Sequence, residues 1–231
     1  AIVAGVPEIF MTVPSLNRNI NPGILYAAKK CKVKIIYKLG GTQAVGAFAY
    51  GTDVVKKVDK IIGPGNEYVS LAKKEVFGEV GIDMFAGPSE VTIIADKNSN
   101  PRWIAADLIA QAEHDELSQS ILVTDSKELI YKVKKFINFQ TKFLPKRGII
   151  SKSLKNFGLA ILAKNKFEIA NIVNKVAPEH LEICTKKPED YLKLINNAGS
   201  IFLGSFSPEA MGDYLAGPNH VLPTLGTARF S

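Results

Sequence analysis

Short apolar runs alternate along the chain with longer stretches in which apolar positions recur at helical spacing. The short runs have the length of buried strands, and the longer stretches have the period of amphipathic helices. The pattern predicts strands at 8–13, 34–39, 60–62, 90–95, 121–124, 159–163, 181–185 and 200–203. It predicts helices at 22–31, 44–50, 67–77, 101–113, 126–142, 166–176 and 188–197. Strands that alternate with helices are typical of parallel sheets with helices packed on their faces.

The alternation is interrupted near residues 142–147, where Pro145 and Gly148 break the helical period. A second series of strands and helices follows this break. We therefore expect an α/β protein with two Rossmann-like, doubly wound units and mostly parallel sheets. The first unit is expected at 1–125, incomplete at its N-terminus, and the second at 126–231.

Charge and cysteine content exclude several classes of protein. The net charge is +7, but the lysines are not interleaved with aromatic residues and no nucleic-acid motif occurs, so we expect no nucleic-acid partner. No apolar run reaches the ~20 residues that a membrane-spanning helix needs. Cys31 and Cys184 are the only cysteines, which favours buried thiols and a cytoplasmic protein.

Turns that contain glycine are candidate ligand sites. Such turns adjoin predicted strands, where sheets of this type open a crevice for ligands and helix N-termini offer N–H groups to phosphates. Gln43 and Asn66 each place a side-chain amide at such a turn. Either amide would suit a ribose or a carboxamide, or would only cap its own helix. The turns are Gly40-Gly41, Gly63-Pro64-Gly65-Asn66, Gly87-Pro88-Ser89 and Gly217-Pro218-Asn219.

A helix at 101–113 leads to a candidate half of a metal site. Asp107, Gln111 and His114 are spaced i, i+4 and i+7, which predicts that they share one helical face. Far along the chain, Asp213 and His220 supply a carboxylate and an imidazole a short loop apart. Zinc takes His, Asp and Glu ligands from more than one segment. The alternative is structural, with Asp213 as a helix-end charge and His220 as a hydrogen-bonding partner within a turn.

Glu179 and His180 follow Pro178 at the entrance of a predicted strand. A carboxylate beside an imidazole is a candidate acid/base pair. Adjacent residues of an extended chain point in opposite directions, so we do not expect the two side chains to bond each other. The alternative is a histidine that caps a helix or packs at the surface.

These candidate residues fall within sequence words that occur, in order, in one enzyme family. On these words the chain resembles histidinol dehydrogenase, the zinc- and NAD-dependent family that catalyses the last two steps of histidine biosynthesis. The words cover residues 40–44, 58–66, 81–90, 111–115, 177–182, 212–223 and 226–230.

The resemblance implies an aldehyde-dehydrogenase-like architecture, an intertwined homodimer, one zinc ion per site, and L-histidinol and NAD as the molecules bound. It assigns acid/base catalysis to Glu179 and His180. His180 would take the alcohol proton, and Glu179 would activate the water that hydrates L-histidinal. It further implies metal binding by Gln111, His114 and Asp213, NAD contacts by Gln43 and Asn66, and substrate contacts by Ser89, Gln111, His114, His180, Asp213 and His220.

The chain departs from the family at both ends. It lacks the family's N-terminal region, and it lacks the C-terminal tail whose Glu and His complete the partner subunit's site. Thr42 and Leu225 stand where the family usually has Ala and Gly. The alternative function is therefore a non-catalytic fragment or remnant without the fourth metal ligand. A third possible function is that of a related enzyme that oxidises another amino alcohol or a sulfonate substrate.

Overall fold

The computed structural model describes residues 1–15, 19–85, 87–217 and 222–230, apart from the side chain of Asp213. By its contacts the chain divides into two compact units, Ala1–Phe85 and Ala86–Ser231. This division falls earlier than the boundary expected at residue 125. The reason is that β5 (Glu90–Ala95) and β6 (Gln119–Thr124), which were expected in the first unit, belong to the same sheet as the later strands.

In the first unit, parallel strands pair two by two. β1 (Phe10–Thr12) pairs with β2 (Ile35–Tyr37), and β3 (Lys60–Ile61) pairs with β4 (Gly81–Ile82). Rings of Tyr37 and Phe48 pack at a centroid distance of 5.7 Å in the core of this unit. The helices that connect the strands are α1 (Pro22–Lys30), α2 (Gly41–Tyr50) and α3 (Glu67–Val76).

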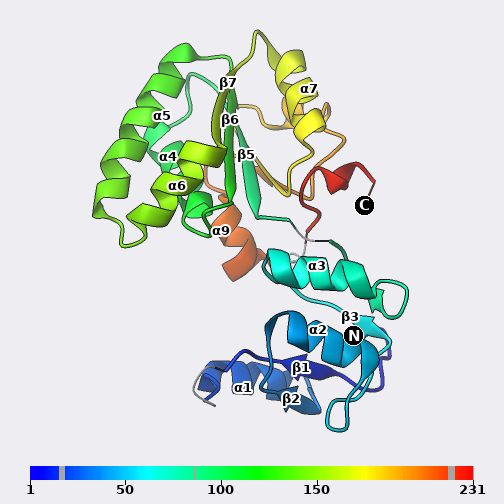
Figure 1. Cartoon of the computed structure of the whole chain (residues 1–231). Coiled ribbons are helices and arrows are strands. Elements are labelled where there is room, and N and C mark those ends of the chain that lie inside the picture. The colour runs from blue at the N-terminus through cyan, green and yellow to red at the C-terminus, as the bar shows by residue number, and fades with distance from the viewer. Residues whose placement is uncertain (16–18, 86, 218–221, 231) are drawn as a thin grey trace. The chain divides into compact units, whose positions relative to one another are not determined.

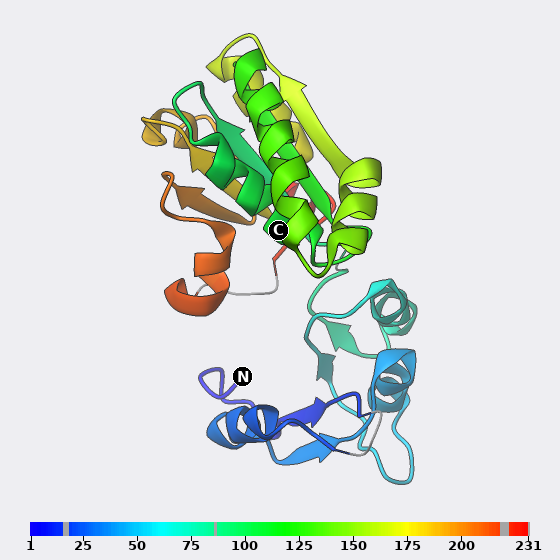
Figure 2. The same ribbon diagram turned by 90° about the vertical axis from the view of Figure 1, so that its left-hand side faces the viewer.

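The second unit is built on a parallel sheet with the order β7-β6-β5-β8-β9. The strands not yet given are β7 (Gly158–Leu162), β8 (His180–Cys184) and β9 (Ser200–Leu203). Figure 2 shows β7 at one edge of this sheet and β9 at the other. Because the strand order reverses between β5 and β8, the sheet is doubly wound, as predicted.

Helices cover both faces of this sheet (Figure 1). On one face lie α4 (Pro101–Ala112), α5 (Lys127–Gln140) and α6 (Arg147–Phe157), and on the other lies α7 (Lys166–Val176). Two short helices, α8 (Glu189–Leu192) and α9 (Glu209–Met211), flank β9 in the sequence. The central strands β5 and β8 are buried throughout, which explains why most of their residues are apolar.

Local sequence signals start the helices of the second unit. Asn100 caps α4 by accepting a hydrogen bond from the Arg102 N–H, and Pro101 occupies the first helical position. α4 starts after the carboxyl end of β5 and ends before the amino end of β6. It therefore returns the chain to the amino edge of the sheet, where the candidate site lies.

Two further expectations concern the class of protein. Among the described residues, no helix is long and apolar enough to cross a membrane. Both cysteines are free thiols, and Cys184 is buried as predicted. The expectation was wrong for Cys31, which is exposed because it follows α1 at the end of the helix.

Candidate active site

The predicted acid/base pair lies at the amino end of β8. His180 is the first residue of this strand and Glu179 precedes it, and both side chains are buried. His180 Nδ1 lies 3.6 Å from Glu179 Oε2, which is too long for a hydrogen bond. The two side chains are therefore close neighbours, whereas adjacent positions on an extended chain had predicted that they point in opposite directions.

Both side chains contact the backbone of Glu90, the first residue of β5. The Glu90 N–H donates a hydrogen bond of 3.0 Å to Glu179 Oε2. The Glu90 carbonyl oxygen lies 3.3 Å from His180 Nδ1. β5 and β8 are hydrogen-bonded neighbours with Val91 opposite His180, so the pairing of the strands fixes both contacts.

Gln111 and His114 lie at the C-terminal end of α4. This end of the helix leads to the amino edge of the sheet. The His114 N–H donates to the Gln111 carbonyl at 3.2 Å, which places the two residues in one turn. The predicted helical face was wrong for His114, because α4 ends at Ala112. His114 is exposed, whereas Gln111 is only 3% exposed.

The donor set of Gln111 and His114 fits a metal ion. An amide oxygen and an imidazole nitrogen are both possible metal donors, although an amide is an unusual ligand for zinc. Gln111 is 3% exposed, and its amide is not among the described buried groups that lack a hydrogen-bond partner. Among the described side chains, no group of three or more His, Cys, Asp or Glu could hold a metal ion. The predicted third ligand, the Asp213 side chain, and the predicted substrate contact His220 lie outside the described residues.

Ser89 precedes β5 at the same amino edge, in the turn Gly87-Pro88-Ser89. The Ser89 carbonyl accepts a hydrogen bond of 3.1 Å from the Gln119 N–H at the start of β6. Neighbouring residues tie this turn to the C-terminal segment: the Gly87 N–H donates to Thr224 Oγ1 at 2.6 Å and the Leu225 N–H donates to Glu90 Oε1 at 2.8 Å.

Gly87 itself cannot carry a side chain in this arrangement. A Cβ atom there would lie 2.4 Å from Leu225 Cγ. The turn and the C-terminal segment are therefore packed in direct contact.

Buried carboxyl groups surround the pair. Burial raises the pKa of Glu90, and the Leu225 N–H offsets part of that rise. Glu182, two residues after His180 on the same face of β8, is fully buried. Burial and the nearby charge of Asp107 raise the pKa of Glu182 to about 8. The amino edge of this sheet is thus a region of low dielectric that contains several acids.

The two predicted NAD contacts, Gln43 and Asn66, lie in the first unit. Asn66 is the N-cap of α3, and its Oδ1 accepts a hydrogen bond of 3.1 Å from the Val69 N–H. Gln43 lies in the first turn of α2, where its Oε1 accepts a hydrogen bond of 3.3 Å from Thr42 Oγ1. The capping role is therefore present for Asn66, and its side-chain NH₂ group is not needed for the cap.

A buried ion pair fixes the turn that contains Asn66. Lys73 Nζ donates to Asp83 Oδ1 at 2.6 Å and to the Gly63 carbonyl at 2.5 Å. The Gly63 N–H in turn donates to Asp83 Oδ2 at 2.8 Å. Gly65 approaches α3 so closely that a Cβ atom there would lie 2.4 Å from Val69 Cγ1.

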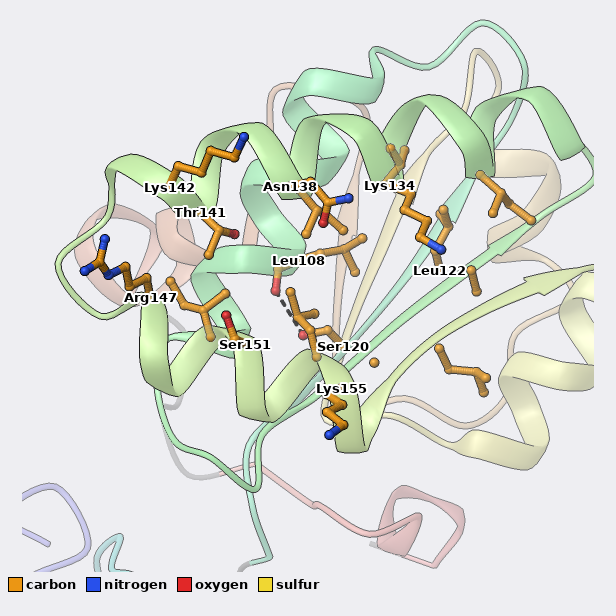
Figure 3. A pocket seen from close by; sticks show the side chains of 18 of the residues that line it. Leu108, Ser120, Leu122, Lys134, Asn138, Thr141, Lys142, Arg147, Ser151 and Lys155 are labelled. Atoms are coloured by element: carbon orange, nitrogen blue, oxygen red, sulfur yellow. Dashed lines mark hydrogen bonds between the residues drawn. The ribbon is translucent and has the colours of Figure 1, made fainter.

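A cavity of about 880 Å³ lies elsewhere in the second unit, between α5, α6 and the strands β6 and β7 (Figure 3). Its walls are mostly apolar, with Lys134, Lys142, Arg147 and Lys155 among the residues that line it. None of the predicted site residues lines this cavity. We therefore place the candidate site at the amino edge of the sheet, where Glu179 and His180, the predicted acid/base pair, lie.

The sequence patterns did not reveal two residues near the pair. Glu209 Oε1 lies 3.3 Å from His180 Nδ1, and the Glu209 N–H donates to Glu182 Oε1 at 2.7 Å. Glu209 comes from a stretch without a clear period. A signal existed for Glu182, because an acid between Leu181 and Ile183 in a buried strand requires a partner.

Comparisons with known proteins identify the family of the chain. The family model described as histidinol dehydrogenase matches residues 1–231. Histidinol dehydrogenase of Clostridium acetobutylicum is 58% identical over 232 residues, which cover 100% of this chain and 54% of that protein. Histidinol dehydrogenase of Pelagibacter ubique is 56% identical, with the same shares of 100% and 54%. The chain thus spans about half the length of the curated relatives it matches.

Solved structures give the same picture. Histidinol dehydrogenase from Elizabethkingia anophelis is similar with a TM-score of 0.91 and 44% identity, over 96% of this chain and 51% of that chain. A putative aldehyde dehydrogenase from Anabaena variabilis has a TM-score of 0.56 at 9% identity, over 89% of this chain and 57% of that chain. The second likeness concerns the fold alone, and it confirms the predicted aldehyde-dehydrogenase-like architecture.

Proposed function

This chain belongs to the histidinol dehydrogenase family, and from that premise we propose that it provides most of the active site for oxidising L-histidinol to L-histidine with zinc and NAD. The observation that carries the proposal is the position of Glu179 and His180. Both are buried at one strand end, and both contact the backbone of Glu90. Two bases held by one backbone unit suit two proton transfers at one carbon.

In the first oxidation, the alcohol of L-histidinol becomes the aldehyde L-histidinal. The alcohol loses its O–H proton and, from carbon, a hydrogen with its electron pair. His180 takes the O–H proton at its ring nitrogen. NAD, when bound, supplies the acceptor for the electron pair.

In the second oxidation, a water adds to the aldehyde. The hydrate then loses a hydrogen with its electron pair from carbon, for which a second NAD would be the acceptor, and a proton from oxygen, which leaves the carboxylic acid. Glu179 takes a proton from this water as it adds. Its burial lowers the local dielectric, so its charge acts on the water without screening by bulk solvent. The Glu90 N–H at 3.0 Å keeps the carboxylate oriented.

Gln111, His114 and Asp213 would hold the zinc ion, which supplies a positive centre for the imidazole and amine of the substrate. Ser89 and His220 would add substrate contacts, and Gln43 and Asn66 would contact NAD. Family membership further favours a homodimer in the cytoplasm.

A segment exchange tests the proposal. This chain would replace the matching 232 residues of the Clostridium acetobutylicum enzyme, to which it is 58% identical. We expect the exchanged protein to reduce NAD when L-histidinol and zinc are present, and L-histidinol to compete against other amino alcohols. A folded exchanged protein without turnover, beside an active parent, would exclude catalysis by this chain.

A further inference from the structure

His180 Nδ1 is surrounded by hydrogen-bond acceptors. The Glu90 carbonyl oxygen and Glu209 Oε1 both lie 3.3 Å away, and Glu179 Oε2 lies 3.6 Å away. A carbonyl oxygen only accepts, and so does a carboxylate. The proton of a neutral His180 ring therefore belongs on Nδ1, which leaves the lone pair on Nε2.

Of the two carboxylates, Glu209 is the better partner for Nδ1. Its oxygen lies 0.3 Å nearer than that of Glu179, from the difference between 3.6 Å and 3.3 Å. Glu179 Oε2 already accepts the hydrogen bond from the Glu90 N–H.

The strand that carries His180 also fixes the backbone of Glu209. The Glu209 N–H donates to Glu182 Oε1 at 2.7 Å. Glu182 is 0% exposed and lies two residues after His180 on β8. The side chains of the two residues therefore point to the same side of the strand. Glu182 on β8 thus binds the backbone of Glu209, the first residue of α9. The side chain of Glu209 in turn lies beside the ring of His180.

We propose that Glu209 is a positioning residue for His180: together with the Glu90 carbonyl, its carboxylate holds the ring proton on Nδ1 and so directs the Nε2 lone pair to the substrate. The inference deepens the proposed function and rests on it. When Nε2 takes the alcohol proton, the ring becomes an imidazolium, and the carboxylate 3.3 Å from Nδ1 offsets the new charge. No proton moves to Glu209.

Within the described part of the chain, acidic residues from three places lie next to His180. Glu179 adjoins it in sequence, Glu90 lies on β5, and Glu209 starts α9. On β9, the ring of Phe202 lies at a centroid distance of 6.2 Å from the His180 ring. Removing the charge of Glu209 leaves the other two acids in place, so the expected effect is a partial one.

The test combines a spectroscopic and a kinetic measurement on Glu209→Gln. This variant keeps the backbone bond to Glu182 and removes only the charge. In the exchanged protein we expect kcat to fall about 10- to 100-fold with KM for L-histidinol nearly unchanged. The acid limb of the pH profile of kcat should move to lower pH, because a lost negative neighbour lowers the pKa of an imidazole.

Nitrogen NMR of this chain with ¹⁵N-labelled histidine reads the ring directly. The signal of His180 is assigned by its loss in His180→Asn. We expect the Nδ1–H tautomer, and a lower titration midpoint in Glu209→Gln. The matched control is Glu189→Gln, which removes an exposed acid from the first position of α8 and should change neither readout.

Two results would overturn the inference: an Nε2–H tautomer of His180, or a Glu209→Gln variant with the parental midpoint and kcat. If Glu209→Gln failed to fold, Glu209→Asp, which keeps the charge, would give the same readouts and should retain the midpoint. If the exchanged protein oxidised no L-histidinol while the NMR result held, the proposed function would fail and the pairing of Glu209 with His180 would stand.

Discussion

Asp107 on α4 and Glu182 on β8 place two carboxyl groups against each other inside the second unit. Burial raises the pKa of both, to about 6 for Asp107 and about 8 for Glu182, and their mutual repulsion adds to the rise at Glu182. Near neutral pH the pair therefore shares one proton. Asp107, which the helical spacing had suggested as a metal ligand, instead partners a buried acid.

This pair predicts a pH dependence of stability. The folded Glu182 retains a proton that the unfolded one releases near its usual pKa of 4.5. The free energy of unfolding should therefore fall as pH rises from about 4.5 to about 8, by at most about 1.4 kcal/mol per pH unit.

Glu182→Gln should flatten that dependence, because the amide keeps an acceptor for the Glu209 N–H and no longer titrates. Denaturant unfolding at several pH values measures the slope, with Glu189→Gln as the control that retains it. An unchanged slope in Glu182→Gln would contradict the shared proton.

The ion pair of Lys73 and Asp83 should stabilise the first unit. Burial alone would raise the pKa of Asp83, but hydrogen bonds from Lys73 and from two backbone N–H groups lower it below its usual value. Lys73→Met leaves this partly buried carboxylate without its charged partner, which should cost about 1–3 kcal/mol of unfolding free energy.

The double variant Lys73→Met/Asp83→Asn should recover part of that loss, and denaturant unfolding measures both. The stabilisation by Asp83 should also disappear as pH falls through its lowered pKa. A Lys73→Met variant as stable as the parent would show that the ion pair of Lys73 and Asp83 contributes nothing to the free energy of unfolding.

Asn66 combines a cap with a predicted NAD contact, and two substitutions separate these roles. Asn66→Ser keeps a capping oxygen for the Val69 N–H but loses the amide NH₂, so KM for NAD should rise while stability is retained. Asn66→Ala should raise KM for NAD too, and it should also lower the free energy of unfolding by about 1 kcal/mol because the cap is lost. If Asn66→Ser kept the parental KM for NAD, Asn66 would act only as a helix cap.

Leu225 has a left-handed backbone, with φ of 53°. This conformation costs roughly 1–2 kcal/mol for a residue with a Cβ. Leu225→Gly removes that strain and the close contact with Gly87. Because glycine also loses more chain entropy on folding, the free energy of unfolding should rise by about 1 kcal/mol or less. Leu225→Ala retains the strain and is the control. A less stable Gly variant would contradict the strain argument.

Much of the fold could be predicted from the sequence because its strands are short apolar runs and its helices have apolar positions at helical spacing. β5, β9 and α7 begin and end where the pattern placed them. α6 was not predicted, since Pro145 and Gly148 were interpreted as a break between units. They instead flank the start of a helix, where both residues are tolerated.

The site was less accessible to sequence reasoning. Spacing and motif predicted Glu179, His180 and Gln111 as candidate residues, and the structure places Glu179 and His180 together at the amino end of β8. Glu209 and Glu182 meet through strand pairing and a chain reversal across 27 residues, and no local period encodes such a contact. The unit boundary was missed for the same reason, since the pairing of β5 with β8 is not visible in either strand alone.

The central claim is that Glu179 and His180 are the catalytic acid/base pair of a zinc-dependent dehydrogenase. The most direct measurement is turnover of L-histidinol by the exchanged protein with His180→Asn or Glu179→Gln, together with its zinc content. We predict a loss of kcat of about 10²- to 10⁴-fold in each variant, with zinc content unchanged. Undiminished turnover in either variant would contradict the account.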